Sequence, residues 1–299
     1  MKNSCETRTN NTASSRCVSK LGLYRKVVII PVSATYTGFD DNRQPQTVEE
    51  WLIAGIHAAD PKKRFYPMPQ FSNIEDQTED NVVYTNAYGR TTPIRDGNVG
   101  FLQSFDLDHC LNKRLLAFSN QTFRAIIFDN DNNAQFTQKG QDLTGMKCNI
   151  FVSMPRPNTP TELSEPTIQY SFLDASENRK TEIVQMGIDW GDVNGLEDLE
   201  LNIIKEGGQF YITFGIACSG EDVTGELRAL DNEAIAWVVK DENGTEQPIS
   251  PPPSFDPTRN AFVVTSLPPN GMIGLANPQV LYELGIGQKD CPRMTQIPM

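Results

Sequence analysis

One stretch of the chain, residues 123–137, constrains the fold more than any other, because it has the pattern of a strand, a tight polar turn and a second strand. Residues 123–128 contain two Phe and two Ile, which are strong β-formers and make both faces apolar. Residues 129–133 are all Asp or Asn, whose short side chains stabilise turns. The stretch predicts a β-hairpin that places Ile126 and Phe128 in the core of the first domain.

The same turn also matches part of a calcium-binding loop. Asp129, Asp131 and Asn133 occupy positions 1, 3 and 5 of that pattern. The pattern then requires Gly at position 6 and a bidentate Glu at position 12, where this chain has Ala134 and Gly140. The flanking residues also favour strands over the two helices that enclose such a loop. We therefore expect a plain β-turn, with no metal ion and no other cofactor.

Length and composition indicate a folded, mainly β protein without a membrane segment. The 299 residues suffice for one large domain or two ordinary ones, and 38% of them are hydrophobic against 21% charged. The 21 Gly and 20 Pro residues indicate many short strands separated by turns. No apolar run is long enough to span a membrane, so no membrane partner is expected.

The charge of the chain is unevenly distributed, which predicts where it makes contacts. The net charge is −12, yet residues 1–30 carry +5 and residues 221–299 carry −6. An acidic body does not suit nucleic-acid binding, which needs a positive surface. We expect the basic arm to bind an acidic surface of a neighbouring subunit instead. The candidate oligomer-contact residues are Arg8, Arg16, Lys20, Arg25 and Lys26.

Turn signals and composition divide the chain into four expected parts. Residues 1–22 form a polar extended arm, residues 23–220 a β-domain, residues 221–288 a small β-module and residues 289–299 a C-terminal tail. The short strands expected in the module, one of them at 227–230, have the regular spacing of an immunoglobulin-like β-sandwich. The Cys–Trp–Cys signature of true immunoglobulin domains is absent.

Two short helices are expected within the β-domain. The first, at residues 47–59, begins with a capping box formed by Thr47 and Glu50 and has one apolar face. The second, at residues 106–118, has Asp106 as its expected N-cap and leads directly into the hairpin described above.

The sequence gives little sign of catalytic chemistry. His57 and His109 are the only histidines and lie far apart, which disfavours a histidine-based metal site. Motifs for nucleophilic hydrolases, phosphate-binding loops and dinucleotide binding are absent. Residues 189–192, Asp-Trp-Gly-Asp, could supply two carboxylates and a sugar-stacking ring, but we favour a turn after a strand, because a pair of acids alone has little specificity. We expect no catalytic residues, no metal-binding residues and no enzyme activity.

Several short motifs together carry a resemblance to a known group of proteins. They include Lys-Val-Val-Ile-Ile-Pro at 26–31, Phe-Tyr-Pro-Met-Pro at 65–69, Arg-Asp-Gly at 95–97, Ile-Ile-Phe-Asp-Asn-Asp-Asn-Asn at 126–133 and the segment that starts with Leu-Ala-Asn-Pro at 275–278. In this order they resemble virion structural proteins of tailed bacteriophages, especially tail-tube-like ring proteins of crAss-like gut phages.

The resemblance implies a β-barrel-like tube fold that closes into rings. It implies a structural protein assembled in the host cytoplasm and located in the virion, where DNA passes through without being specifically bound. The implied partners are other copies of the chain and neighbouring tail, portal or adaptor proteins. An acidic wall agrees with this function, because it repels phosphate.

Two other classes of protein remain open from the sequence. A capsid decoration or head-fibre protein would also be β-rich and would also carry an immunoglobulin-like module. A carbohydrate-binding or glycan-degrading protein would use the Asp-Trp-Gly-Asp turn at 189–192.

Overall fold

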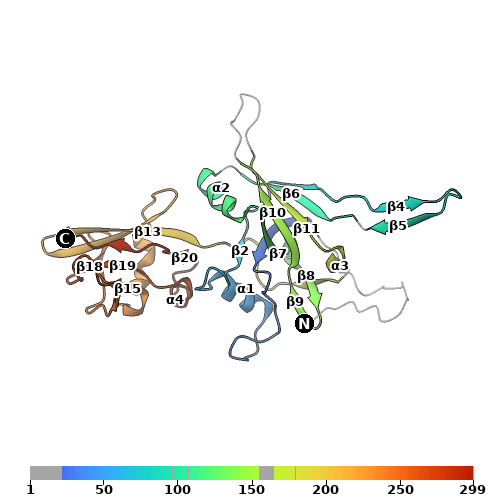
Figure 1. Ribbon diagram of the computed structural model, residues 1–299. Helices are drawn as coiled ribbons and strands as arrows, with labels where there is room; N and C mark the ends of the chain where they lie inside the picture. The colour runs from blue at the N-terminus through green and yellow to red at the C-terminus, as the bar shows by residue number, and fades with distance from the viewer. Residues whose placement is uncertain (1–21, 96, 107, 155–164, 179, 299) are drawn as a thin grey trace, which may run out of the picture. The chain divides into compact units, whose positions relative to one another are not determined.

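The protein is mainly β, as predicted, with a few short helices (Figure 1). The computed structural model describes residues 22–95, 97–106, 108–154, 165–178 and 180–298. Nearly all of the expected N-terminal arm lies outside these residues. The chain forms two compact units, of which the first comprises Met1–Gly55 and Lys62–Asn194 and the second comprises Ile56–Pro61 and Gly195–Met299.

The first unit is built on a curled half-barrel sheet around strand β7 (Gln121–Asp129), the first strand of the predicted hairpin. One edge of β7 pairs along most of its length with β1 (Tyr24–Ile30), and its other edge pairs with two successive strands. Those two strands are β8 (Asn133–Lys139) and β10 (Met146–Val152). Ile126 and Phe128 are fully buried, as the sequence predicts, because β7 has neighbours on both edges and apolar residues on both faces.

The sheet continues from β10 to one edge and from β8 to the other. β11 (Thr167–Phe172), β6 (Gly100–Ser104) and β3 (Asn73–Asp76) follow β10 in that order. β12 (Thr181–Gln185) pairs with β8. The short strands β2 (Tyr66–Pro67) and β9 (Asp142–Thr144) pair with β1 and β8. A core of buried residues from β1, β6, β7, β10 and β11 fills one face of this sheet.

The helices of the first unit are shorter than predicted. Helix α1 (Val48–Ile56) has the expected capping box, in which the Thr47 amide donates to Glu50 and the Glu50 amide donates to Thr47. Helix α2 (His109–Leu115) continues as a 3-10 turn, η1 (Leu116–Phe118), and a single turn forms α3 (Ala175–Asn178). The predicted cap of α2 is wrong, because Asp108 accepts the amide hydrogen bonds there instead of Asp106.

Strands β4 (Val82–Thr85) and β5 (Thr91–Arg95) form a two-stranded ribbon that extends beyond the main sheet of the first unit (Figure 1). Among the described strands they pair only with each other. The ribbon rises from the β3–β6 pair, because the Gln77 amide bonds to the Gly100 carbonyl and the Glu79 amide bonds to the Asn98 carbonyl. The two pairs therefore make one long hairpin arm.

The second unit consists of two sheets that share one core. The first sheet has the order β17 (Ser254–Asp256), β18 (Ala261–Val264), β14 (Gln209–Ile216), β13 (Glu197–Glu206) and β20 (Lys289–Asp290). The second has the order β16 (Glu246–Gln247), β15 (Trp237–Lys240), β19 (Met272–Leu275) and β21 (Thr295–Gln296). Trp237 of the second sheet packs against Phe214 and Phe262 of the first, so the arrangement is a small β-sandwich.

Three short helical segments complete this unit, and one corrects a prediction. They are η2 (Thr224–Leu230), η3 (Ala234–Ala236) and α4 (Pro278–Glu283). The strand predicted at 227–230 is wrong, because these residues form the end of η2.

The structure places the division of the chain at Asn194–Gly195, whereas the predicted boundary is 220/221. The reason is the pairing of β14 with β18, which joins residues 210–212 to residues 262–264 in one sheet. The predicted C-terminal tail at 289–299 is also wrong for the residues described. β20 pairs with β13, β21 pairs with β19, and Ile297 is buried in the shared core.

Candidate interaction surface

Of the five predicted oligomer-contact residues, the structure describes Arg25 and Lys26, while Arg8, Arg16 and Lys20 lie outside the described residues. Lys26 is only 4% exposed, so its prediction as a surface contact is wrong. Its ammonium nitrogen Nζ donates to the Val193 carbonyl at 2.6 Å and to Asn194 Oδ1 at 2.8 Å. Burial lowers the pKa of Lys26 to about 8, and the nearby Asp192 charge acts in the opposite direction.

Arg25 stands at the irregularity where β1 shifts its register against β7, and it is half-buried. Its carbonyl accepts a hydrogen bond from the Phe71 amide at 3.2 Å. Of the predicted contact residues that the structure describes, Arg25 is therefore the one that retains access to solvent.

The polar turn at 129–133 binds other segments of the first unit to the hairpin through hydrogen bonds. Asp129 accepts hydrogen bonds from the amides of Gly22, Asp131 and Asn133, and a further one from the Asn133 side chain. Burial raises the pKa of the Asp129 carboxyl, but these hydrogen bonds outweigh that effect and hold the pKa below its usual value. The part of the chain that the structure describes has no group of three or more His, Cys, Asp or Glu side chains placed to hold a metal ion.

The same turn also receives the segment after β12. The Asn132 carbonyl accepts from the Met186 amide at 2.9 Å, and the Asn132 side chain accepts from the Trp190 amide at 3.0 Å. Asp189 accepts from the Gly191 amide, and Trp190 is half-buried. These contacts describe a capped turn at 189–192.

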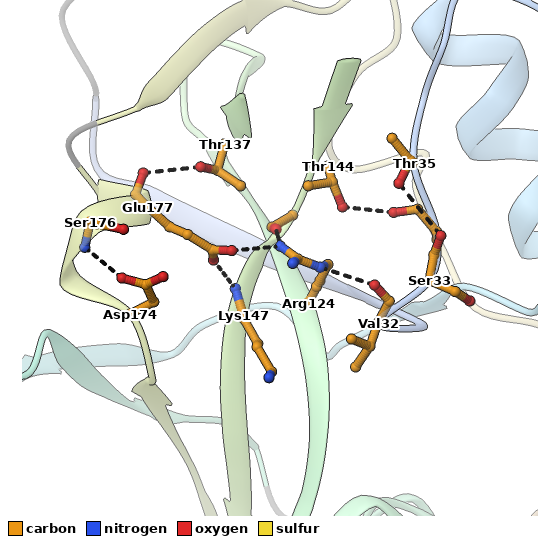
Figure 2. Close-up of polar contacts among 12 residues, drawn as sticks. Val32, Ser33, Thr35, Arg124, Thr137, Thr144, Lys147, Asp174, Ser176 and Glu177 are labelled. Carbon is orange, nitrogen blue, oxygen red and sulfur yellow. Dashed lines mark hydrogen bonds and ion pairs between the residues drawn. The ribbon is translucent and has the colours of Figure 1, made fainter. Parts of the chain in front are cut away.

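A largely buried ion pair joins Arg124 of β7 to Glu177 of α3 (Figure 2). The Arg124 Nη1 atom lies 3.0 Å from Glu177 Oε1 and also donates to the Gly145 carbonyl at 2.7 Å. The second carboxylate oxygen of Glu177 accepts the Lys147 amide at 2.7 Å, and the Arg124 Nε atom donates to the Val32 carbonyl at 3.1 Å. The pair therefore joins α3, β7, β10 and the segment that follows β1.

A shallow cavity of about 440 Å³ adjoins this ion pair. Its polar lining includes Thr137, Lys139, Asp174, Ser176 and Lys180. Thr137 and Asp174 are already occupied, since the Thr137 hydroxyl donates to the Glu177 carbonyl and Asp174 accepts the Ser176 amide. These contacts stabilise the fold, and we call the Arg124–Glu177 ion pair with its hydrogen bonds the Arg124–Glu177 brace.

The β4–β5 ribbon exposes large apolar side chains to solvent. Tyr88, at the tip, is 96% exposed, and the other four members are between 43% and 67% exposed: Val82, Val83, Tyr84 and Ile94. We call these five side chains the ribbon patch. Val82 and Tyr84 alternate with Val83 along β4, so the patch covers both faces of the ribbon.

The tip of the ribbon is well defined although its side chains are exposed. The Asn86 side chain accepts the amides of Tyr88 and Arg90 at 3.0 Å and 2.9 Å, and the Gly89 amide donates to the Asn86 carbonyl. Gly89 has a φ of 77°, which favours glycine. These hydrogen bonds therefore define the backbone that carries Tyr88.

A pocket of about 510 Å³ opens on the half-barrel. It is lined mostly by apolar and aromatic side chains from six strands and the base of the arm, and its one charged lining residue is Asp76. Tyr24 donates its hydroxyl to Gln135 at 3.0 Å inside the pocket, and burial and the Asp129 charge raise the pKa of Tyr24. The main lining residues are Tyr24, Ile74, Asp76, Val99, Phe101 and Phe172.

Sequence reasoning identified neither the ribbon patch nor the pocket. It expected short strands in this region, but a run such as Val82-Val83-Tyr84 has the same β-forming character whether its side chains are buried or exposed. One sequence feature does distinguish the ribbon: residues 82–95 contain no acidic residue, although the chain as a whole is acidic.

Comparison of the chain with family models, curated proteins and solved structures finds no match. Within the described residues, no helix has the length and apolar character needed to cross a membrane.

Proposed function

We propose that this chain is a structural virion protein that oligomerises into a ring or tube of a phage tail through which DNA passes. The observation that supports this proposal best is the ribbon patch. Isolated two-stranded ribbons are marginally stable in water, and soluble monomers rarely expose a group of large apolar side chains. A ribbon that carries five such side chains suits a protein whose free form is an assembly intermediate.

Two further features fit this function. The acidic composition gives a wall that does not retain DNA. The polar groups of the hairpin turn and of the Arg124–Glu177 brace are engaged in hydrogen bonds within the fold, which suits a scaffold.

The decisive experiment is to measure the oligomeric state of the purified protein. Light scattering coupled to size-exclusion chromatography should show concentration-dependent oligomers, and negative-stain images should show rings or stacks. A protein that stays monomeric up to about millimolar concentration would contradict the proposal. Small discrete oligomers without a ring would favour a capsid decoration or head-fibre protein, and specific retention on a glycan array would favour a carbohydrate-binding protein.

A further inference from the structure

We propose that the pocket on the half-barrel of one copy receives Tyr88 from the ribbon of a second copy. This inference rests on the proposed self-assembly and names the contact that produces it. The ribbon and the pocket lie at different places on the same unit, so the contact is heterologous and repeats from one copy to the next.

The chemistry of the pocket matches an aromatic side chain. Val99, Phe101 and Phe172 supply an apolar lining, and Ile74 and Val99 are only partly buried where they border the core. The core of the first unit therefore remains open to solvent at this point. Pockets of roughly 300–1,000 Å³ with a few polar groups are typical of binding sites, and this volume accommodates a tyrosine side chain.

The charges of the two surfaces are complementary. Residues 82–95 contain Arg90 and Arg95 and no acidic residue, although the whole chain has a net charge of −12. The pocket has Asp76 as its charged lining residue, and Glu75 precedes it on the exposed strand β3. The Asp76 pKa lies below its usual value, because Asp76 accepts hydrogen bonds from Thr78. Arg90 of an incoming ribbon would therefore meet an ionised carboxylate at the pocket.

The basic N-terminal arm is the other candidate occupant within this chain. Its sequence from 1 to 21 is dominated by Asn, Ser, Thr and charged residues and contains no aromatic residue. The ribbon supplies both the positive charge and the aromatic and aliphatic groups that the pocket lining requires, so we assign the pocket to the ribbon.

The first test separates the two halves of the contact. Tyr88→Ser removes the inserted side chain and leaves the pocket intact, whereas Ile74→Trp fills the pocket and leaves the ribbon intact. Each variant alone should need at least about tenfold more protein to assemble than the unmodified chain, since tenfold corresponds to about 1.4 kcal/mol. An equimolar mixture should form heterodimers, because it retains one working contact.

The matched control is Ile204→Ser, which removes a side chain that is 64% exposed on the second unit. It should leave assembly unchanged. If Tyr88→Ser assembles as well as the unmodified chain, the pocket assignment is wrong while the ring proposal stands. If the unmodified chain does not assemble at all, the proposed function itself fails.

A second test does not depend on the folding of Ile74→Trp. Replacing Tyr88 by the photoreactive p-benzoylphenylalanine places a cross-linker at a fully exposed position. Irradiated oligomers should yield cross-links from position 88 to peptides containing residues 74–78 or 99–101 of another copy. Cross-links confined to any other peptide, including residues 1–21, would overturn the assignment.

Discussion

At the scale of single residues, the most informative feature is a lysine that lies inside the fold. Lys26 immediately precedes a β-branched and apolar run at 27–30, and its ammonium group bonds to Val193 and Asn194 at the end of the first unit. A sequence of basic residues before a strand favours a solvated arm, and nothing in the local pattern shows that one of these residues faces inward. The two acceptors come from a segment more than 160 positions away, and only the folded chain brings them to Lys26.

The buried Lys26 predicts a specific pH dependence of stability. Its pKa is about 8 in the folded state and near 10.5 when unfolded. Between these values the unfolded chain binds more protons, so the free energy of unfolding rises with pH, by at most about 1.4 kcal/mol per pH unit. The destabilisation caused by Lys26→Met should therefore be larger at pH 9.5 than at pH 7. Urea titrations of both proteins at the two pH values would measure it.

The control is Lys205→Met, because Lys205 lies on β13 of the second unit and is solvent-exposed. Its effect on the free energy of unfolding should not change over the same pH range. An equal effect of Lys26→Met at both pH values would show that the lysine is charged inside the fold up to its usual pKa.

The Arg124–Glu177 brace gives a second prediction at this scale. Glu177→Ala removes the partner of a largely buried guanidinium and also leaves the Lys147 amide without its acceptor. We expect the free energy of unfolding to fall by about 3 kcal/mol, because an uncompensated buried charge is costly. The double variant Arg124→Met/Glu177→Leu should be less destabilised than Glu177→Ala. A double variant that is less stable than Glu177→Ala would contradict this account.

At the scale of elements, local signals in the sequence were reliable wherever a short segment determines its own structure. The capping box of α1 and the hairpin around β7 formed as predicted, because their stabilising contacts lie within a few residues. The ribbon shows the limit of such signals, because the same β-forming residues occur in strands whose side chains are buried and in strands whose side chains are exposed.

The base of the ribbon provides a prediction about its rigidity. A Cβ atom at Gly97 would lie 1.9 Å from the Glu79 carbonyl oxygen, so the two backbones can approach only with glycine at this position. Gly97→Ala should separate the strands at the base and weaken the hydrogen bonds of the Gln77 and Glu79 amides. Hydrogen exchange at these two amides should accelerate while amides in β7 stay protected.

Gly187→Ala is the matched control, since the nearest atom to its added Cβ would be a Glu49 side-chain oxygen at 3.6 Å. Exchange at Gln77 and Glu79 should be unchanged in this variant. If Gly97→Ala also leaves both amides protected, the close approach of the two backbones at Gly97 does not determine the rigidity of the ribbon base.

At the scale of the whole molecule, the boundary between the units depends on contacts that local patterns do not report. The change in sequence style after residue 220 suggested a boundary there, yet β13 and β14 pair with strands that lie beyond it, at residues 289–290 and 262–264. The general class of the fold followed from composition and turn spacing. The unit to which each strand belongs could not be predicted in this way, because it depends on pairing between strands that are far apart in the sequence.

The position of the boundary, at 194/195 or at 220/221, can be tested with two fragments of the second unit. The fragment 195–299 contains both sheets of the sandwich, whereas the fragment 221–299 lacks β13 and β14 and with them Phe210, Ile212 and Phe214 of the core. We expect a cooperative thermal transition for the longer fragment and none for the shorter. Near-ultraviolet circular dichroism would report the packing of Trp237. A cooperative transition in fragment 221–299 would restore the boundary that the sequence suggested.

The polar turn at 129–133 also has a mechanical consequence. Gly22, where the described chain begins, bonds to Asp129, and the segment that leads to Asn194 bonds to Asn132 and to Lys26. A pulling force applied at Gly22 and at Asn194 would therefore be transmitted through one turn and the strand beside it. Such a load path bypasses most of the half-barrel, so tension on the ends of the first unit would break a few polar bonds before it deformed the apolar core.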